Sequence, residues 1–405
     1  MEKEEEFLFN FFTYISQLSF DKAKEHVEKE RNRSSGLQSL AWSVLLNTLP
    51  QIVLAEKNYM EIGFLQNKHK SFLRKDNSLR SIYETLKSDL KRLEENCKHN
   101  AHDKHAVGHI KNISHFLTAR IDLIDLYENI FVVGSNRLLK YNDLLVHIGN
   151  LIDKYVLYFT DIGLTPFKAV FSLECEILQQ LFRALCELQD LQFLPSLALI
   201  HGAQTRLTAW ENKMQNRETW KLGFLKSNSL PLLFQWLVKF KGAVLSKLSL
   251  YFHDRLAQQT TLSDMRQLCC KLQYDYYQKM VQFQRKYDSS TVLLITDSQI
   301  TLDSSDMFPI IVSCPMRAAP QHETILRMIG DAIVELVNND KIIYKYSTQE
   351  QCTYILYTIE THIYLVIVFD SKKSEKDTFI TNFVLEFSTN LRCAKVFTSL
   401  KNPTK

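Results

Sequence analysis

The feature that most constrains the fold of this chain is a change in the spacing of its apolar residues near position 287. Before that point apolar side chains recur every three to four residues, for example over 110–127, 170–185 and 232–248. Such spacing places them on one face of an α-helix. After Tyr287-Asp-Ser-Ser290 the apolar runs become short and β-branched, beginning with Thr291–Ile295. A helical part followed by a part with strands is therefore predicted.

The apolar stripes of the first part are wide, which is typical of helices that bury a broad face in a bundle. Helices are expected near 5–31, 37–48, 51–73, 78–96, 109–132, 137–160, 167–189, 195–218, 231–258 and 263–286. We expect a helical bundle domain over residues 1–287 and a smaller α/β domain over 288–405. The last predicted helix, 263–286, is also able to pack with the smaller domain.

The C-terminal part has the predicted order ββαβββα. Strands are expected at 291–295, 308–312, 341–346, 353–359 and 363–369, and helices are expected around 325–337 and 379–391. The last strand is apolar on both faces, as expected for a central or doubly covered strand. Ser374 and Asp377 fit a capping box that opens the final helix. The order is similar to that of roadblock and longin-like folds, and the pattern alone leaves profilin-like folds open.

Composition excludes several classes of protein. The chain has 49 basic and 45 acidic residues, a net charge of +4, which does not favour a nucleic-acid-binding protein with a basic stripe. No run of about 18 apolar residues is present, so membrane insertion is not expected. The most apolar stretch, 232–252, is interrupted by Lys239, Lys241 and Lys247.

The cysteines and the start of the chain indicate a cytoplasmic protein. The 8 cysteines contain no Cys-x-x-Cys pair, and the chain opens with Met1-Glu-Lys-Glu-Glu-Glu6 instead of a signal sequence. Reduced thiols are expected, including those of the adjacent Cys269 and Cys270, which point in different directions on a helix.

Catalytic motifs are not found in the sequence. It has no Gly-x-Ser-x-Gly, His-Glu-x-x-His or phosphate-loop pattern, and no cofactor is expected. The segment from Cys97 to His115 is rich in histidine, and His105 and His109 have a spacing that helical zinc ligands can use. A solvated, loop-like connection is the preferred interpretation, because paired Cys or His arms are missing. His201 and His253 lie among apolar residues and are interpreted as structural.

Several uncommon strings occur in order along nearly the whole chain. They are Ser19–Arg31, Phe193–Ala203 continuing to Trp210, Tyr251–Arg255 with Gln258–Thr261, Val366–Ile380 and Lys395–Lys401, with further support from Arg80–Tyr83 and Arg285–Asp288. Together they resemble the second-subunit family of KICSTOR, a scaffold that places a negative regulator of the TORC1 kinase on lysosomes.

This resemblance implies a non-catalytic scaffold subunit. Its partners would be the large seizure-threshold subunit, kaptin and the FG-GAP-repeat subunit, with self-association as a further expectation. The assembly would recruit GATOR1 and so inhibit TORC1 when amino acids or glucose are scarce. The chain itself would be cytoplasmic and reach the lysosomal surface through its partners.

The candidate partner-contact residues lie in segments that carry the resemblance. They are Asp21, Lys22, Lys24, Glu28, Arg31, Arg255, Lys372, Lys373 and Lys376. For each segment the alternative is an ordinary solvated helix face or charged turn.

Two other classes of function stay open at this point. A longin-like platform for a small GTPase in membrane trafficking predicts nucleotide-dependent GTPase binding. A hydrolase with an unrecognised motif predicts a concave pocket that holds an acid or base with a perturbed pKa. The missing catalytic motifs disfavour the hydrolase, and the resemblance along the whole chain disfavours the platform.

Overall fold

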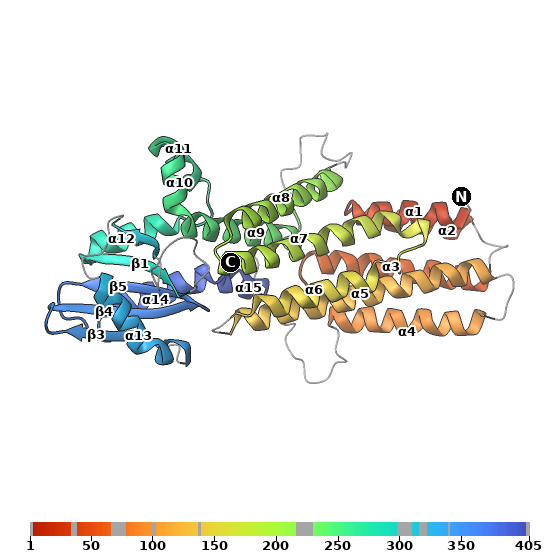
Figure 1. The fold of residues 1–405 in the computed structure, drawn as a ribbon. Helices are drawn as coiled ribbons and strands as arrows, with labels where there is room; N and C mark the ends of the chain where they lie inside the picture. Colours follow the sequence, from red (N-terminus) through yellow and green to blue (C-terminus); the bar gives the residue numbers. More distant parts are fainter. Residues whose placement is uncertain are drawn as a thin grey trace.

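The protein is an elongated molecule, with long helices along most of its length and a β-sheet at one end (Figure 1). The computed structural model describes residues 3–33, 39–65, 78–98, 103–136, 139–215, 230–297, 310–315, 322–338 and 341–401. The N-terminus lies at the end opposite the sheet, whereas the last helix returns to the middle of the molecule.

The helical part follows the predicted periodicity. Its first elements are α1 (Lys3–Ser16), α2 (Phe20–Arg33), α3 (Leu40–Met60), α4 (Leu79–Cys97), α5 (Lys104–Gly134), α6 (Tyr141–Tyr155) and the short 3-10 turn η2 (Ile162–Leu164). They are followed by α7 (Thr165–Gln189), α8 (Phe193–Gln215), α9 (Leu232–Tyr251), α10 (His253–Gln259), α11 (Leu262–Cys270) and α12 (Tyr276–Tyr287). The change of pattern predicted near residue 287 coincides with the end of α12.

Several predicted helices have the wrong extent. The expected helix 5–31 is two helices, because Leu18 adopts a left-handed φ of 58° and the chain turns there. The ranges 231–258 and 263–286 are also each divided, at Phe252 and at 271–275. Conversely, 37–48 and the first part of 51–73 form the single helix α3, which contains Pro50. Residues 66–73 of that range lie outside the described residues.

The described residues of the C-terminal part form a five-stranded antiparallel sheet. Its strands are β1 (Thr291–Thr296), β2 (Ile310–Cys314), β3 (Ile343–Ser347), β4 (Cys352–Glu360) and β5 (Ile363–Phe369). They lie in the order β2-β1-β5-β4-β3, so the strand that is apolar on both faces, β5, is central as predicted. With α13 (His322–Asn338) and α14 (Thr378–Leu391), the observed order is the expected ββαβββα.

Alternate residues of the central strands pack on opposite faces of the sheet. Leu293, Tyr354 and Val366 lie in a cluster with Ile325 and Ile329 of α13. The other face, with side chains such as Val292, Ile355 and Ile367, belongs to the large cluster that continues into the helical bundle. On that face Phe283 of α12 lies against Phe369 of β5, with ring centroids 6.3 Å apart. The division into domains 1–287 and 288–405 stays a prediction.

The predicted capping box forms a turn and is displaced from the helix start. Asp377 accepts a hydrogen bond from the Ser374 amide at 2.8 Å, as the reciprocal half of the motif requires. The helix begins only at Thr378, however, with Asp377 as its N-cap residue. The motif therefore shapes the turn before α14.

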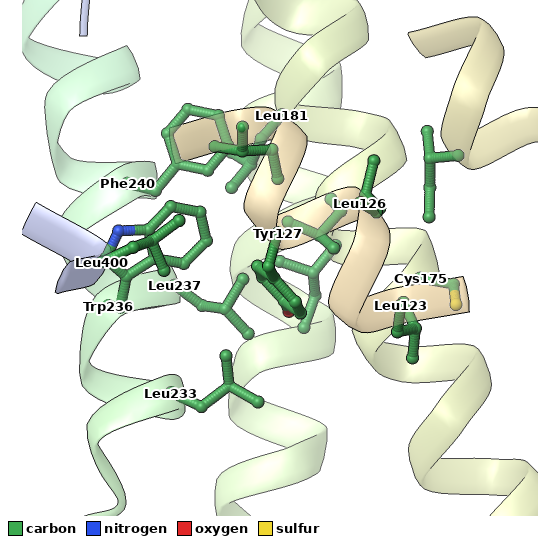
Figure 2. Close-up of a cluster of buried hydrophobic side chains, with 14 of the residues drawn as sticks. Leu123, Leu126, Tyr127, Cys175, Leu181, Leu233, Trp236, Leu237, Phe240 and Leu400 are labelled. Atoms are coloured by element: carbon green, nitrogen blue, oxygen red, sulfur yellow. The ribbon is translucent and has the colours of Figure 1, made fainter. Parts of the chain in front are cut away.

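The C-terminal segment inserts into the helical bundle. α15 (Ala394–Thr398) and the 3-10 turn η4 (Ser399–Lys401) follow α14 and contact α5 and α9. Figure 2 shows Leu400 beside Trp236 and Leu237, in a cluster that also holds Tyr127 and Phe240. The end of the sheet region thus contributes side chains to the bundle core.

Candidate partner-binding surfaces and the buried junction

The predicted contact residues on α2 lie at the end of the molecule far from the sheet (Figure 1). Asp21, Lys22, Glu28 and Arg31 are exposed, and Lys24 is half-buried. Ala23 and Val27 on the opposite face are fully buried against the bundle. The helix is therefore amphipathic, with its charged face available to solvent.

The remaining predicted contact residues lie elsewhere. Arg255 is exposed on α10, which projects from the molecule together with α11 (Figure 1), and its guanidinium lies 5.8 Å from the Phe252 ring centroid. Lys372, Lys373 and Lys376 lie in the turn between β5 and α14. The structure therefore separates the nine residues into three surfaces and does not assemble them into one site.

Two lysines of that turn lie over aromatic rings. The ammonium of Lys372 is 5.6 Å from the Tyr346 ring centroid, and that of Lys373 is 5.1 Å from Phe369. Such contacts use the lysine stems as cover for apolar surface while the charges stay in contact with water.

The histidine-rich segment is largely helical, so its interpretation as a solvated loop was wrong. His105, His109 and His115 lie on α5, whereas His99 and His102 lie outside the described residues. His109 is buried and its Nδ1 lies 2.6 Å from Asp161. Within the described ranges, no group of three His, Cys, Asp or Glu residues could hold a metal ion.

The contact between His109 and Asp161 shifts the pKa of both side chains. Burial lowers the pKa of His109, but the hydrogen bond and charge of Asp161 raise it more, so the net pKa lies above the ordinary value. The pKa of Asp161 is lowered, because His109 outweighs the effect of burial. The pair fixes the start of α5 to the turn before α7.

The structure also places the two histidines that were predicted to be structural, His201 and His253, and the adjacent cysteines. His253 is buried and stacks on Tyr277 with ring centroids 3.5 Å apart, whereas His201 is exposed on α8. Cys269 and Cys270 are free thiols, one half-buried and one exposed.

A buried ion cluster, here called the bundle network, joins four helices. Arg120 of α5 lies between Glu56 of α3, at 2.8 Å, and Glu174 of α7, at 2.9 Å. The Tyr83 hydroxyl donates to Glu56 at 2.6 Å, and the hydroxyls of Tyr59 and Tyr127 donate to Glu174 at 2.7 and 2.8 Å. Arg120 is only 2% exposed, so these partners replace its hydration.

The tyrosines of the bundle network are hydrogen-bond donors over the whole physiological pH range. Burial, followed by the negative charge of Glu174, raises the pKa of Tyr59 and Tyr127 well above its usual value. Burial and Glu56 do the same for Tyr83. Each phenol keeps its proton and holds one carboxylate oxygen in place.

A second buried cluster, the junction network, joins the bundle to the sheet. Lys247 of α9 is 0% exposed and pairs with Glu360 at the end of β4. The hydroxyls of Tyr141 on α6 and Tyr251 on α9 donate to the same carboxylate at 2.6 and 3.2 Å. Arg392 donates to the carbonyls of Thr358 and Ile359 in β4. Glu360 is thus held by two helices of the bundle.

The C-terminal segment strengthens the same junction. The Trp236 indole N–H of α9 donates to the Val396 carbonyl at 2.8 Å. The last residue of α5, Gly134, lies so close to Phe397 that an added Cβ would be 2.5 Å from the Phe397 Cβ. A glycine at this position therefore lets α15 approach α5.

Comparison with known proteins places the chain in a family. The family described as KICSTOR complex C12orf66 like matches residues 1–304 and 301–405. A zebrafish (Danio rerio) protein named KICSTOR subunit 2 is 32% identical over 435 residues, which cover 100% of this chain and 97% of the relative. A Xenopus laevis protein of the same name is 31% identical over 436 residues, 99% of this chain and 97% of the relative. The chain belongs to this family.

Membership extends over the bundle, the junction and the sheet. The two matched ranges of the family model meet within the segment between β1 and β2, so both sides of the junction network belong to the shared fold. In the part of the chain that the structure describes, none of the helices is long and apolar enough to cross a membrane.

Sequence reasoning proposed candidate contact residues, which stay a prediction, and missed both buried networks. The signal that could have found them is a single charged residue at an inward position of an apolar stripe. Arg120 lies between Leu117 and Ile124, Glu174 lies between Val170 and Ile177, and Lys247 interrupts the stripe of α9. Such residues are rarely buried unless they are paired.

Proposed function

We propose that this chain is a non-catalytic scaffold subunit of a KICSTOR-like complex. In this role it helps to recruit GATOR1 to the lysosomal surface and so inhibits TORC1 signalling during amino-acid or glucose starvation. The observation that carries the proposal is similarity over the whole chain to two relatives named KICSTOR subunit 2. The chain is cytoplasmic in this proposal and reaches the lysosome through its partners.

The buried charges support a structural role and not a catalytic one. Glu56, Glu174 and Glu360 each accept hydrogen bonds from tyrosines and pair with a buried cation. Their oxygens hold helices and strands together, which is what a scaffold with a fixed shape requires. A catalytic acid or base instead needs reach to a substrate.

The shape of the molecule supports two separate contact regions. The charged face of α2 and the sheet lie at opposite ends (Figure 1). We propose that the helical bundle docks the large subunit, with Asp21, Lys22, Lys24, Glu28 and Arg31 as candidate contacts. The sheet end, with Lys372, Lys373 and Lys376, and the projecting Arg255 would supply further contacts to kaptin, the FG-GAP-repeat subunit or a second copy.

Affinity purification of the tagged chain from its own cells, followed by mass spectrometry, tests the assembly. Recovery of the large KICSTOR subunit together with GATOR1 is expected. Recovery of a small GTPase with trafficking proteins, and no KICSTOR subunit, would contradict the proposal and favour the platform function.

A charge on the edge of the sheet tests the contact at that end. Among the described strands, β3 lies at the edge of the sheet and pairs with β4, and Tyr344 in it is half-buried. Tyr344→Glu should reduce recovery of at least one partner. The control is Val334→Glu on the exposed face of α13, where Val334 is 69% exposed. Equal recovery with both variants would remove the sheet edge from the proposed interface.

A further inference from the structure

The face of the sheet that carries α12 and α14 also carries an open groove of about 370 Å³ between these two helices. Its residues extend along both helices, from Tyr276 to Tyr287 and from Thr378 to Asn390. At a rise of about 1.5 Å per residue, the groove runs for roughly 16 Å. A groove of that length, open along one side, fits a polypeptide segment better than a compact small molecule.

The floor of the groove consists of aromatic rings paired across the two helices. Phe283 stacks on Phe383 with centroids 4.0 Å apart, and Tyr287 stacks on Phe379 at 4.3 Å. Tyr276 meets Phe387 edge-on at 5.6 Å. Tyr287, Phe379 and Phe383 are only half-buried, so part of each ring is presented to solvent. Such a surface accepts apolar or aromatic anchors.

The charged residues that line the groove are two lysines and one glutamate, and Asp275 and Asp377 stand next to lining residues in the chain. Exposed Lys279 and Lys286 line the groove from α12. Lys373 lies 5.8 Å from the Phe379 ring centroid, and the ammonium of Lys395 donates to the Tyr274 hydroxyl at 3.3 Å. Glu386 is the acidic residue that lines the groove. The lining residues therefore give the groove a small excess of positive charge, which favours an anionic occupant.

We propose that this groove docks an acidic peptide segment of another protein, with apolar or aromatic side chains on the stacked rings and carboxylates facing the lysines. An extended segment of about five residues spans the groove at roughly 3.3 Å per residue. This inference deepens the proposed function and rests on it for the partner's identity, whereas the chemistry of the segment follows from the groove alone.

A photo-crosslinking residue at Gln282, on the exposed rim of the groove, is the probe. The whole tagged chain is expressed in its own cells, irradiated and purified, and crosslinked peptides are sequenced. The same probe at the exposed Gln204 of α8 is the control position. The expected product is a crosslink from position 282, and not from 204, to a segment of net negative charge.

Charge reversal then tests the recognition itself. The double variant Lys279→Glu/Lys286→Glu should reduce the yield of that crosslink at least about tenfold. Changing the acidic residues of the crosslinked segment to lysine should restore it. Both lysines are exposed, so folding should be unchanged, which thermal unfolding checks. The variant Lys104→Glu/Lys111→Glu on α5, two exposed lysines with the same seven-residue spacing, is the matched control and should leave the yield unchanged.

Several results would overturn the groove proposal. These are no crosslink above the control position, a crosslink to a neutral or basic segment, a crosslink to a second copy of this chain, or an acidic crosslink that the double reversal leaves intact. The proposed function can fail separately. An acidic crosslink in a protein outside KICSTOR and GATOR1, with no KICSTOR subunit recovered, would contradict that function and support the groove.

Discussion

The bundle network and the junction network are both buried charge clusters, yet they differ in what they join. The bundle network places Arg120 between two glutamates and adds three tyrosine donors, all from helices of the bundle. The junction network has one ion pair, Lys247 with Glu360, that connects α9 to β4. The first holds the bundle together, and the second holds the bundle to the sheet.

The difference shows how an elongated subunit can keep its two ends in a fixed relation. Apolar packing alone is weakly directional, whereas hydrogen-bonded charges accept only a few geometries. Glu360 receives donors from α6 and α9, and the segment that follows α14 enters the bundle core. Loss of the bundle network should therefore unfold the bundle, and loss of the junction network should release the sheet end.

The largest effect is expected for Arg120→Met. It leaves Glu56 and Glu174 buried without their cation, and removal of one partner from such a cluster costs about 3–5 kcal/mol. We expect the free energy of unfolding, measured in urea, to fall by an amount near the upper end of this range. The control is Arg206→Met, because Arg206 pairs with Glu176 on the partly exposed surface between α8 and α7. That pair should contribute at most about 1 kcal/mol. Equal losses in the two variants would contradict the role of the bundle network.

Lys247→Met should lower the free energy of unfolding somewhat less, by about 3 kcal/mol. It leaves one carboxylate without its cation, and two tyrosines still donate hydrogen bonds to that carboxylate. The double variant Lys247→Met/Glu360→Met should recover much of the loss, since apolar replacement of a buried pair is often neutral. Urea unfolding of the two single variants and the double variant gives the coupling energy. Additive losses would mean that the pair is not coupled.

Gly134→Ala should cost about 1–3 kcal/mol, since the added methyl group meets Phe397 and overpacks the contact between α5 and α15. The control lies in the same helix. The methyl group added by Gly108→Ala would meet no atom within 4 Å, so this variant should be neutral or more stable by up to about 1 kcal/mol. Thermal unfolding of both variants checks the sign, and a stabilising Gly134→Ala would exclude the close contact.

The smallest effect, about 1 kcal/mol, is expected for His109→Gln, which keeps a neutral hydrogen-bond donor near Asp161. The raised pKa of His109 means that its contribution to stability is fully present below pH 6.5 and is lost as the pH rises through the folded-state value. The lowered pKa of Asp161 makes its contribution present above pH 3.8 and lost in more acidic solution.

The difference in unfolding free energy between wild type and His109→Gln should therefore be largest between pH 3.8 and 6.5. It should shrink as the pH rises further. Urea unfolding at several pH values measures it, and a difference that grows above pH 6.5 would show that the sign is wrong.

Sequence periodicity predicted the order of elements well because each stripe is long and regular. The central position of β5 followed from its two apolar faces, and the observed order confirms it. Breaks were harder to predict. Leu18 and the segment after Cys270 turn without glycine or proline, whereas Pro50 lies inside α3 because buried Leu46, Leu49, Ile52 and Val53 continue the stripe past it.

The candidate surfaces could be proposed from local strings, but their spatial relation could not. Lys247 and Glu360 are 113 positions apart, and their elements meet where α9 contacts α12, β2, α14 and α15. The groove between α12 and α14 depends in the same way on two distant helices. A single sequence contains no direct signal for such pairs.

The central claim is that the two ends of the subunit form one rigid body held at the junction. The most direct measurement is the distance distribution between spin labels on unnatural residues at Glu28 of α2 and Val334 of α13, both exposed. We predict one narrow distance in the wild type and a broad distribution in both Lys247→Met and Lys247→Met/Glu360→Met, because the apolar pair restores stability but not the directional contacts of the network. A broad distribution in the folded wild type would contradict the claim.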